Sequence, residues 1–401
     1  MSAASPTPPQ RSRLLSQQGK PASSLFIGLM SGTSADGVDA VLMTTSPAPQ
    51  ALLLVSQPFS PPLRQAIEAL QQPGPNELER AADLANALAD AYANSARALL
   101  AEARLSASDI IAIGAHGQTV RHKPERGYTL QILNAARLAE TTGIAVVHDL
   151  RSVDVAAGGQ GAPLVPAFHA SVFGSADSRR AIVNIGGIAN VSLIPRLRPD
   201  QPLQVLGYDT GPGNTLLDYW SARHLGTAFD EGGRWAAGGS PDEALLNILL
   251  GDHYFGQLPP KRTGRDLFNA EWLERALRRC PTRPRPQDVQ ATLAELTALT
   301  ISRACEGHAK EIYLCGGGAF NRDLVGRLCR LLPDITIADT GVLGIAPMAV
   351  EAAAFAWLAW RRVTSQSGNL PAVTGASGFR VLGSVTDPWG SLASTPSADP
   401  P

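Results

Sequence analysis

The sequence lacks the features that mark several large classes of protein. No stretch of it approaches the ~18 consecutive apolar residues of a membrane span, and its formal net charge of −1 includes no block of Lys or Arg. Binding to nucleic acid or to a membrane surface is therefore not indicated. The four cysteines show no CxxC spacing. This spacing argues against a zinc site or a disulfide framework and favours a reduced, cytoplasmic setting.

Two missing motifs narrow the class of enzyme. The chain contains no G-x-x-x-x-G-K-[ST] and no G-x-S-x-G, so neither a P-loop nucleotide site nor the nucleophile elbow of a hydrolase is expected. The first 23 residues are rich in Ser, Pro and Gln and lack the apolar run of a secretory signal. We predict that residues 1–23 and the Pro/Ser-rich residues 363–401 are disordered extensions.

The rest of the chain repeats one pattern of strands and helices. Strands are expected at 25–30, 38–44, 51–56, 110–114, 128–133 and 144–148, with helices at 62–104, broken at 71–75, and at 135–142. The second copy has strands at 181–185, 190–194, 204–208, 311–315 and 335–338 and helices at 216–224, 242–250, 270–279, 287–306, 321–332 and 348–362. This duplicated β-β-β-α-β-α-β unit predicts a two-domain α/β fold: domain I at 24–155 plus 345–362, domain II at 156–344, and ATP between them.

Residues 27–41 are the most informative segment, because an apolar strand leads into a small-residue turn with two carboxylates and then into a second strand. Glycines let a ligand approach the backbone, whose N–H groups suit phosphate. Asp36 and Asp39 are placed to orient magnesium-bound water. The alternative is an ordinary β-hairpin, but such hairpins close with about two turn residues. We predict a phosphate-binding loop of Gly32, Thr33, Ser34, Ala35, Asp36, Gly37, Val38 and Asp39.

Two further Gly-rich turns follow strands. Asn184, Gly186 and Gly187 belong to a second hairpin that mirrors the first, and two such turns can hold a triphosphate from both sides. Gly316, Gly317 and Gly318 precede a helix that starts near Asn321, which suits a phosphate or a planar ring. The structural alternatives are a simple tight turn for the first group and close helix–strand packing for the second.

Asp209 opens the segment D-T-G-P-G-N directly after an apolar strand. A carboxylate at a strand's carboxyl end, held by a Gly-Pro-Gly turn, is placed to face a ligand. Capping of the next helix is the structural alternative, but Asn214 can do that. Because Asp339-Thr340-Gly341 repeats the tripeptide, an aspartic protease is a rival. The Ala/Leu-rich helices around both copies argue against it.

Polar side chains gather at other predicted strand ends. They are His116, Gln118, Arg151, Asp154 and Gln160, and residue types of this kind bind sugars by hydrogen bonds. Arg151 can pair with a substrate carboxylate in a bidentate manner. For each residue alone, structural hydrogen bonding is an equal alternative. Residues 261–265 form a basic loop, by default solvated, that would serve phosphates or ribose if it lay near a nucleotide.

The motifs together resemble the anhydro-N-acetylmuramic acid kinases, a family of the actin/Hsp70/hexokinase superfamily. The matching segments are G-L-M-S-G-T-S-A-D-G-V-D (28–39), H-G-Q-T (116–119), G-G-Q-G-A-P-L-V-P (158–166), N-I-G-G-I-A-N (184–190), D-T-G-P-G-N (209–214), T-G-R-D-L-F (263–268), C-G-G-G-A-F-N (315–321) and E-A-A-A-F-A-W-L-A (351–359). The resemblance covers residues 25–362. Ala35 departs from the family's usual Leu, and Met348 stands where an acidic residue is expected.

The resemblance implies a specific reaction. With ATP, Mg²⁺ and water, the family converts 1,6-anhydro-N-acetylmuramic acid to N-acetylmuramic acid 6-phosphate during recycling of the cell wall. Asp209 inherits the role of catalytic base, residues 32–39 that of the ATP loop, and Glu351 is added to the substrate residues. Rival interpretations are a kinase of the same fold for another sugar and a non-catalytic actin-like scaffold. The oligomeric state, monomer or homodimer, is left open.

Overall fold

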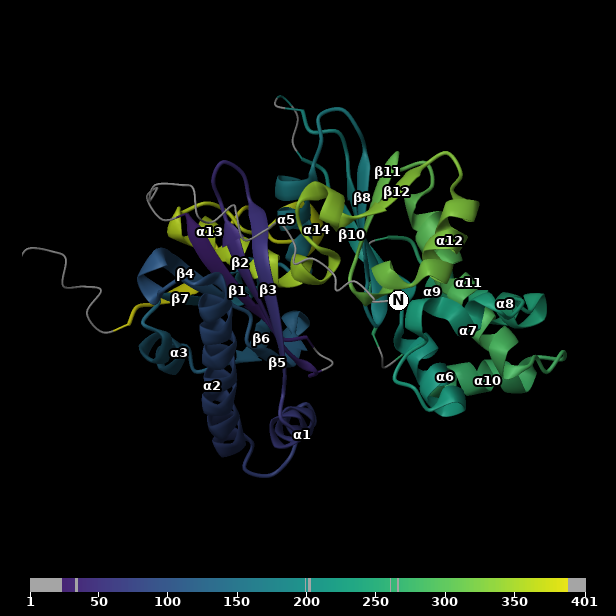
Figure 1. Ribbon diagram of the computed structural model, residues 1–401, viewed down its shortest axis with the longest axis horizontal. Helices are drawn as coiled ribbons and strands as arrows, with labels where there is room; N and C mark the ends of the chain where they lie inside the picture. The colour runs from purple at the N-terminus through teal and green to yellow at the C-terminus, as the bar shows by residue number, and fades with distance from the viewer. Residues whose placement is uncertain are drawn as a thin grey trace, which may run out of the picture.

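The computed structural model describes residues 24–32, 35–198, 200, 203–259, 261–264 and 267–388. Two β-sheets form the centres of two lobes that lie side by side (Figure 1). The first sheet has the order β13-β7-β4-β1-β2-β3 and the second β10-β9-β8-β11-β12. The strands of the first sheet are β1 (Leu25–Met30), β2 (Gly37–Thr44), β3 (Gln50–Pro58), β4 (Ile110–Ala115), β7 (Val146–His148) and β13 (Ser384–Thr386).

The second sheet repeats the topology of the first. Its strands are β8 (Arg180–Ile185), β9 (Ile188–Ile194), β10 (Leu206–Pro212), β11 (Glu311–Cys315) and β12 (Thr336–Asp339). In each lobe the first strand pairs antiparallel with the second and parallel with the fourth, and the second pairs antiparallel with the third. The fifth strand pairs parallel with the fourth. The predicted duplication of one α/β unit is therefore confirmed.

The helices also follow the predicted order. They are α1 (Pro61–Leu70), α2 (Glu77–Ala103), α3 (Ala135–Thr142), α4 (Ser152–Ala156), α5 (Val165–Phe173), α6 (Thr215–Leu225), α7 (Arg234–Ala237), α8 (Glu243–Leu250), α9 (His253–Gly256), α10 (Ala270–Arg279), α11 (Pro286–Cys305), α12 (Arg322–Leu331), α13 (Val350–Val363) and α14 (Pro371–Thr374). Asn134 caps α3 by accepting from Arg137 N, and Gly143 ends it at a φ of 69°. Within the described residues, no helix is long and apolar enough to cross a bilayer.

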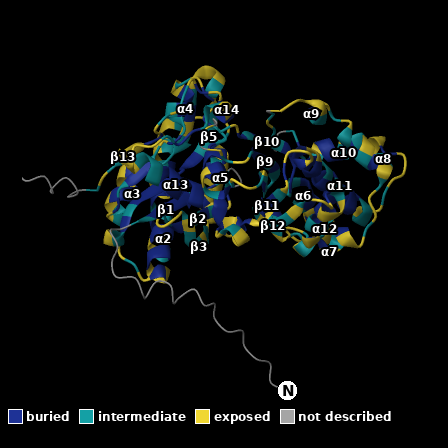
Figure 2. Cartoon of the chain, turned by 90° about the horizontal axis from the view of Figure 1, so that it is seen from above, coloured by how far each residue is buried: buried dark blue, intermediate teal, exposed yellow. Residues whose placement is uncertain are grey.

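Helix α13 lies directly on the backbone of the first sheet. Gly28 on β1 and Gly114 on β4 are paired neighbours in this sheet. A Cβ at Gly28 would lie 1.8 Å from the carbonyl oxygen of Ala352, and one at Gly114 would lie 2.0 Å from that of Phe355. The helix therefore needs both glycines. It runs through the buried interior of the lobe, where its small residues pack against the sheet (Figure 2).

The sequence prediction misses some elements, and it is wrong for residues 363–388. The missed elements are α4, α5, α7, α9, β5 (Gln118–Lys123) and the pairing of β5 with β6 (Tyr128–Ile132). Within residues 363–388, α14 forms, β13 pairs with β7, and Leu382 is buried in the core. Ser/Pro-rich composition hides this order because buried polar contacts, described below, hold the segment. The predicted disorder of 1–23 and of 389–401 concerns residues outside those described.

Replacing Gly28 by alanine is expected to destabilise the protein strongly. The added methyl would collide with backbone atoms of α13, which cannot move aside as a flexible side chain would. We expect the free energy of unfolding to fall by about 3 kcal/mol or more, measured by urea denaturation. Gly256→Ala is the matched control, because its Cβ would meet no atom within 4 Å. Equal stability of the two variants would contradict the packing described.

Candidate functional site

A buried polar network supports the predicted phosphate loop from below. The Ser31 hydroxyl lies 2.7 Å from the Tyr92 hydroxyl and donates to Gln118 Oε1 at 2.9 Å. Gln118 Nε2 in turn donates to the carbonyl of Gly32 at 3.1 Å. The sequence predicts that Gln118 binds a sugar. Its side chain has no exposed surface, so in this conformation it cannot touch one. It holds the loop in place instead.

Within the loop itself, side chains and backbone have separate tasks. Thr33 and Ser34 lie outside the described residues. Ala35 has a φ of 54° and is buried, as is Val38. At Gly37 a Cβ would lie 2.2 Å from a carbonyl oxygen of β3, so this glycine serves strand packing. Of these residues, Ala35 and Val38 have only the backbone to offer a ligand.

The two carboxylates of the loop differ sharply. Asp36 is 68% exposed and lies 3.5 Å from the guanidinium of Arg64. Asp39 is partly buried and accepts a hydrogen bond from Ser56 at 2.5 Å. Burial raises the pKa of Asp39, and the Ser56 hydrogen bond opposes this increase. Asp39 is thus the better placed of the two carboxylates to bind a magnesium ion.

Glu351, at the start of α13, joins the two lobes. Its Oε1 accepts a hydrogen bond from Asn184 Nδ2 of β8 at 3.0 Å. Glu351 keeps exposed surface. The protein packed around it, and after that the negative charge of Asp39, raise the pKa of its carboxyl. In the described part of the chain, no group of three or more His, Cys, Asp or Glu could hold a metal by itself. A pair of carboxylates completed by phosphate oxygens is the arrangement that Mg²⁺ commonly uses.

His116 and Arg151 are bound to each other. His116 Nε2 accepts from Arg151 Nε at 3.2 Å and contacts Nη2 at 2.9 Å, while Nδ1 lies 3.2 Å from the carbonyl of Ser31. Burial and the charge of Arg151 lower the pKa of His116 to about 3, so the ring is neutral. Arg151 Nη1 donates to the carbonyl of Gly161 at 2.8 Å. Its guanidinium is therefore largely occupied by the protein, which disfavours the predicted bidentate pairing with a substrate.

Asp154 ties the C-terminal segment to the loop of residues 158–163. This fully buried carboxylate accepts from Gly161 N, Asn369 Nδ2 and Thr374 Oγ1, each at 2.8 Å. Gln160 N donates to the carbonyl of Thr374 at 2.7 Å, and the rest of Gln160 is exposed. Asp154 has its oxygens occupied within the protein, so it positions the loop, whereas Gln160 stays available to a ligand.

Asp209 lies where β10 breaks its regular pairing with β9, at a bulge between Asp209 and Gly211. Its Oδ2 accepts from Thr263 N at 2.9 Å, and its backbone carbonyl accepts from the Tyr254 hydroxyl at 2.5 Å. Burial raises the pKa of Asp209, and the Thr263 hydrogen bond and the charge of Arg262 oppose this increase. The result is a fixed, partly buried carboxylate with raised proton affinity, as a general base requires.

The turn after Asp209 is packed on the second Gly-rich hairpin. Gly213 N donates to the carbonyl of Gly187 at 2.9 Å, and Asn214 N donates to that of Gly186 at 2.8 Å. A Cβ on Gly213 would lie 2.3 Å from the Gly186 oxygen, so the approach requires glycine. Asn214 does not cap α6 with its side chain, which donates instead to the carbonyl of Ile185 at 3.0 Å. The structure thus brings two predicted motifs into contact.

A cavity of about 620 Å³ opens next to this turn. Its lining includes Gly317 and Asn321, which the sequence predicted, and also Phe229 and Phe320, which it missed. These phenylalanines are 59% and 57% exposed, and exposed aromatic rings at a cavity suit a planar ligand. Gly316 and Gly318 instead pack closely on β8. The only sequence signal for Phe229 and Phe320 is an aromatic residue within a polar segment.

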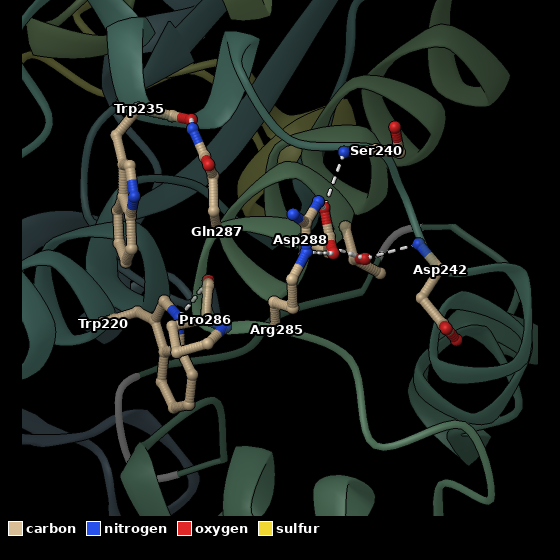
Figure 3. A network of polar contacts seen from close by, with 9 residues as sticks. Trp220, Trp235, Ser240, Asp242, Arg285, Pro286, Gln287 and Asp288 are labelled. Atoms are coloured by element: carbon tan, nitrogen blue, oxygen red, sulfur yellow. Dashed lines mark hydrogen bonds and ion pairs between the residues drawn. The ribbon is translucent and has the colours of Figure 1, made fainter.

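A polar network joins α6 and α7 to the start of α11 (Figure 3). Trp220 Nε1 of α6 donates to the carbonyl of Pro286 at 2.7 Å, and Gln287 Nε2 donates to that of Trp235 at 3.0 Å. Trp235 follows Arg234, which itself lines the cavity. The network thus ties both α6 and α7 to the start of α11.

Comparison with known proteins adds a family. The anhydro-N-acetylmuramic acid kinase family matches residues 24–388, so the match extends beyond the residue 362 at which the sequence analysis ended it. A protein of that name from Paraburkholderia xenovorans (strain LB400) is 51% identical over 91% of this chain and 98% of its own length. One from Chromobacterium violaceum is 51% identical over 90% of this chain and 98% of its own. Among solved structures, a xylulose kinase from Rhodospirillum rubrum matches with 14% identity and a TM-score of 0.42, covering 91% of this chain and 94% of its own.

Thr374→Val is expected to lower the free energy of unfolding by about 1.5–3 kcal/mol, because it removes a hydrogen bond to the buried carboxylate of Asp154. Chemical denaturation measures the change. Thr336→Val is the control, since Thr336 is exposed on β12. If both variants unfold at the same denaturant concentration, Asp154 does not anchor the C-terminal segment.

Proposed function

The chain belongs to the anhydro-N-acetylmuramic acid kinase family, and from this premise we propose the reaction that its site performs. It is an ATP-dependent sugar kinase. It opens the 1,6-anhydro ring of 1,6-anhydro-N-acetylmuramic acid with water and phosphorylates O6, giving N-acetylmuramic acid 6-phosphate and ADP in the recycling of peptidoglycan. We place it in the cytoplasm, where its four unpaired cysteines would stay reduced.

The carboxylate of Asp209 is the observation that carries the proposal. In the anhydro-sugar, O6 is bonded to C1 and has no proton to lose. Asp209 takes a proton from water, the water oxygen bonds to C1, and the C1–O6 bond breaks. The freed O6 then attacks the γ-phosphorus of ATP, and ADP leaves. The raised pKa of Asp209 suits proton abstraction near neutral pH.

Different parts of the site bind different parts of ATP: the cavity binds the adenine ring, and the Gly-rich turns bind the phosphates. The adenine ring of ATP lies in the cavity, between Phe229 and Phe320. The phosphates extend past Asn214, which lines the cavity and is bonded to the Gly186 carbonyl. From there they reach the loop at Gly32. Backbone N–H groups at such turns stabilise the charge of the transferring phosphoryl group.

Asp39 and Glu351 are the residues that would hold Mg²⁺, together with phosphate oxygens and water. The negative charge of Asp39 contributes to the raised pKa of Glu351, as expected of two carboxylates that lie close together. When bound, the ion neutralises charge on the phosphates. Asp36 is left out of this set because it is exposed and pairs with Arg64.

The anhydro-sugar lies between Asp209 and the pair formed by the neutral His116 ring and the charged Arg151 guanidinium. These two residues present a rigid surface, because protein atoms hold both ring nitrogens of His116 and the Nε and Nη1 atoms of Arg151. Gln160, with its exposed side chain, is a direct ligand of the sugar. Gln118 and Asp154 act by positioning the two loops around it.

Asp209→Asn is expected to lower kcat about 100- to 10,000-fold, because the amide cannot accept the proton from water. ATP affinity, measured by calorimetry, should change little. Asp36→Asn is the matched control and should keep wild-type turnover, since Asp36 takes no part in the proposed metal set. Wild-type turnover by Asp209→Asn would refute the assignment of the base.

Oxygen-labelled water tests the hydrolytic step in the same assay. The label is expected at C1 of the phosphorylated product after a rapid quench. Unlabelled product incubated in labelled water corrects for exchange at the anomeric carbon. In addition, kcat/KM should fall with acid at a pH above ~4, the ordinary pKa of Asp, because the raised pKa of Asp209 leaves it protonated there.

Phe229→Ala is expected to raise the Kd for ATP by roughly 5- to 150-fold, which corresponds to the loss of one stacked base. Binding of inorganic tripolyphosphate should be unchanged, since it has no base to stack. Phe379→Ala is the control, as Phe379 is 65% exposed and is not among the residues that line the cavity. An equal loss of affinity for ATP and for tripolyphosphate would show that the adenine ring does not stack on Phe229.

A further inference from the structure

Beside Asp209 lies a group of polar side chains that the reaction as described leaves unused. Thr263, whose backbone N–H binds Asp209 Oδ2, has its hydroxyl oxygen buried and without a hydrogen-bond partner in the described part of the chain. A buried, unpaired hydroxyl is costly in a finished protein. Next to it in sequence is Arg262, whose positive charge acts on Asp209. Both therefore face the region of the catalytic carboxylate.

His122 reaches the same region from the first lobe. It lies on β5, with Nδ1 at 3.0 Å from the Thr129 hydroxyl, while its buried Nε2 has no partner among the described residues. After burial, the charges of Arg151 and Arg262 are the main influences that lower the pKa of His122. The imidazole thus stays neutral and near two guanidinium groups, and a neutral ring can still donate one hydrogen bond.

Arg151 and Arg262 each donate to a backbone carbonyl of the loop at residues 161–162, but they differ in how many guanidinium N–H groups remain free to bind a ligand. Arg151 Nη1 donates to Gly161 O, and its other nitrogens face His116. Arg262 Nη2 donates to Ala162 O, its one hydrogen bond among the described residues. Arg262 is also exposed, whereas Arg151 is partly buried. The guanidinium with free donor groups is therefore that of Arg262.

These groups match the chemistry of a carboxylate. A guanidinium donates two parallel hydrogen bonds to a carboxylate, and hydroxyl and imidazole N–H groups complete the set. The nearby negative charges do not already fill this role: Asp154 is occupied by Gly161, Asn369 and Thr374, and Asp209 accepts from a backbone N–H. An anion of the substrate would supply the missing partner.

We propose that Arg262, with the Thr263 hydroxyl and His122 Nε2, binds the lactyl carboxylate of the sugar and makes the enzyme selective for an acidic anhydro-sugar. The inference rests on the proposed function. It assigns to Arg262 the carboxylate contact that the sequence alone suggested for Arg151. It also couples recognition to catalysis: a bound carboxylate offsets the charge of Arg262 beside Asp209 and leaves the base more basic when the correct substrate is present.

The test compares two sugars that differ only in the lactyl group, 1,6-anhydro-N-acetylmuramic acid and 1,6-anhydro-N-acetylglucosamine. For the wild type, kcat/KM should be higher with the acid. Arg262→Gln should lower kcat/KM for the acid about 10- to 100-fold more than for the neutral sugar. A loss of folded protein in the variant is common to both sugars and cancels in the ratio, which therefore reports the carboxylate contact together with its effect on Asp209. Thr263→Val should shift the ratio in the same direction by a smaller factor.

Controls separate the outcomes. Arg285→Gln removes an arginine that is 74% exposed at the start of α11 and should leave both sugars unaffected. Arg262→Lys, which keeps the charge, should retain part of the preference. Equal losses for the two sugars in Arg262→Gln, or a wild type that does not distinguish them, would overturn the inference. If the wild type phosphorylates neither sugar, the proposed function fails instead, and calorimetric binding of the acid to wild type and Arg262→Gln still decides the carboxylate contact.

Discussion

The arrangement of the whole molecule depends on one contact, the backbone-to-backbone packing of α13 against β1 and β4. Two glycines that are neighbours across these strands, Gly28 and Gly114, leave a surface without side chains, and the helix lies in it. The position of Glu351 follows, because it begins the same helix. From there it reaches Asn184 on the second sheet. The packing of α13 within one lobe thereby places Glu351 against a strand of the other lobe.

The duplicated units have been put to different uses at equivalent places. The turn between β1 and β2 rests on buried side chains, namely Ser31, Tyr92 and Gln118. The turn between β8 and β9 is instead held by backbone hydrogen bonds from the segment after Asp209. The loop of the first arrangement is also held on the side of β3, where Phe59 N donates to the carbonyl of Asp36. The second fixes its turn to the strand that carries Asp209, so the Gly-rich turn and this carboxylate are held in one hydrogen-bonded unit.

The fold was predictable from the sequence to a large extent, because the strands and helices of both copies carry clear apolar periodicity and marked ends, such as Asn134 and Gly143 around α3. The motif residues were also found, but their tasks were not. Gln118 and Asp154 look like ligands in a sequence, since no pattern distinguishes a polar group bound to the protein from one facing a sugar. Residues 363–388 read as disordered because Asn369 and Thr374 are polar, and their burial depends on Asp154, more than 200 positions away. Arg262 and Phe229 acquire meaning only through neighbours that are distant in the chain.

The pairing of β13 with β7 has a consequence for synthesis on the ribosome. The first sheet receives its last strand, and the long helix on its face, from the end of the chain, after the whole second lobe has been made. Domains of nascent chains usually complete folding in the order in which they emerge. Here the lobe that is begun first must wait with the groove at Gly28 and Gly114 uncovered, so the second lobe can close its core earlier. The site therefore receives Glu351, the residue that α13 contributes to it, only after the whole second lobe has been synthesised.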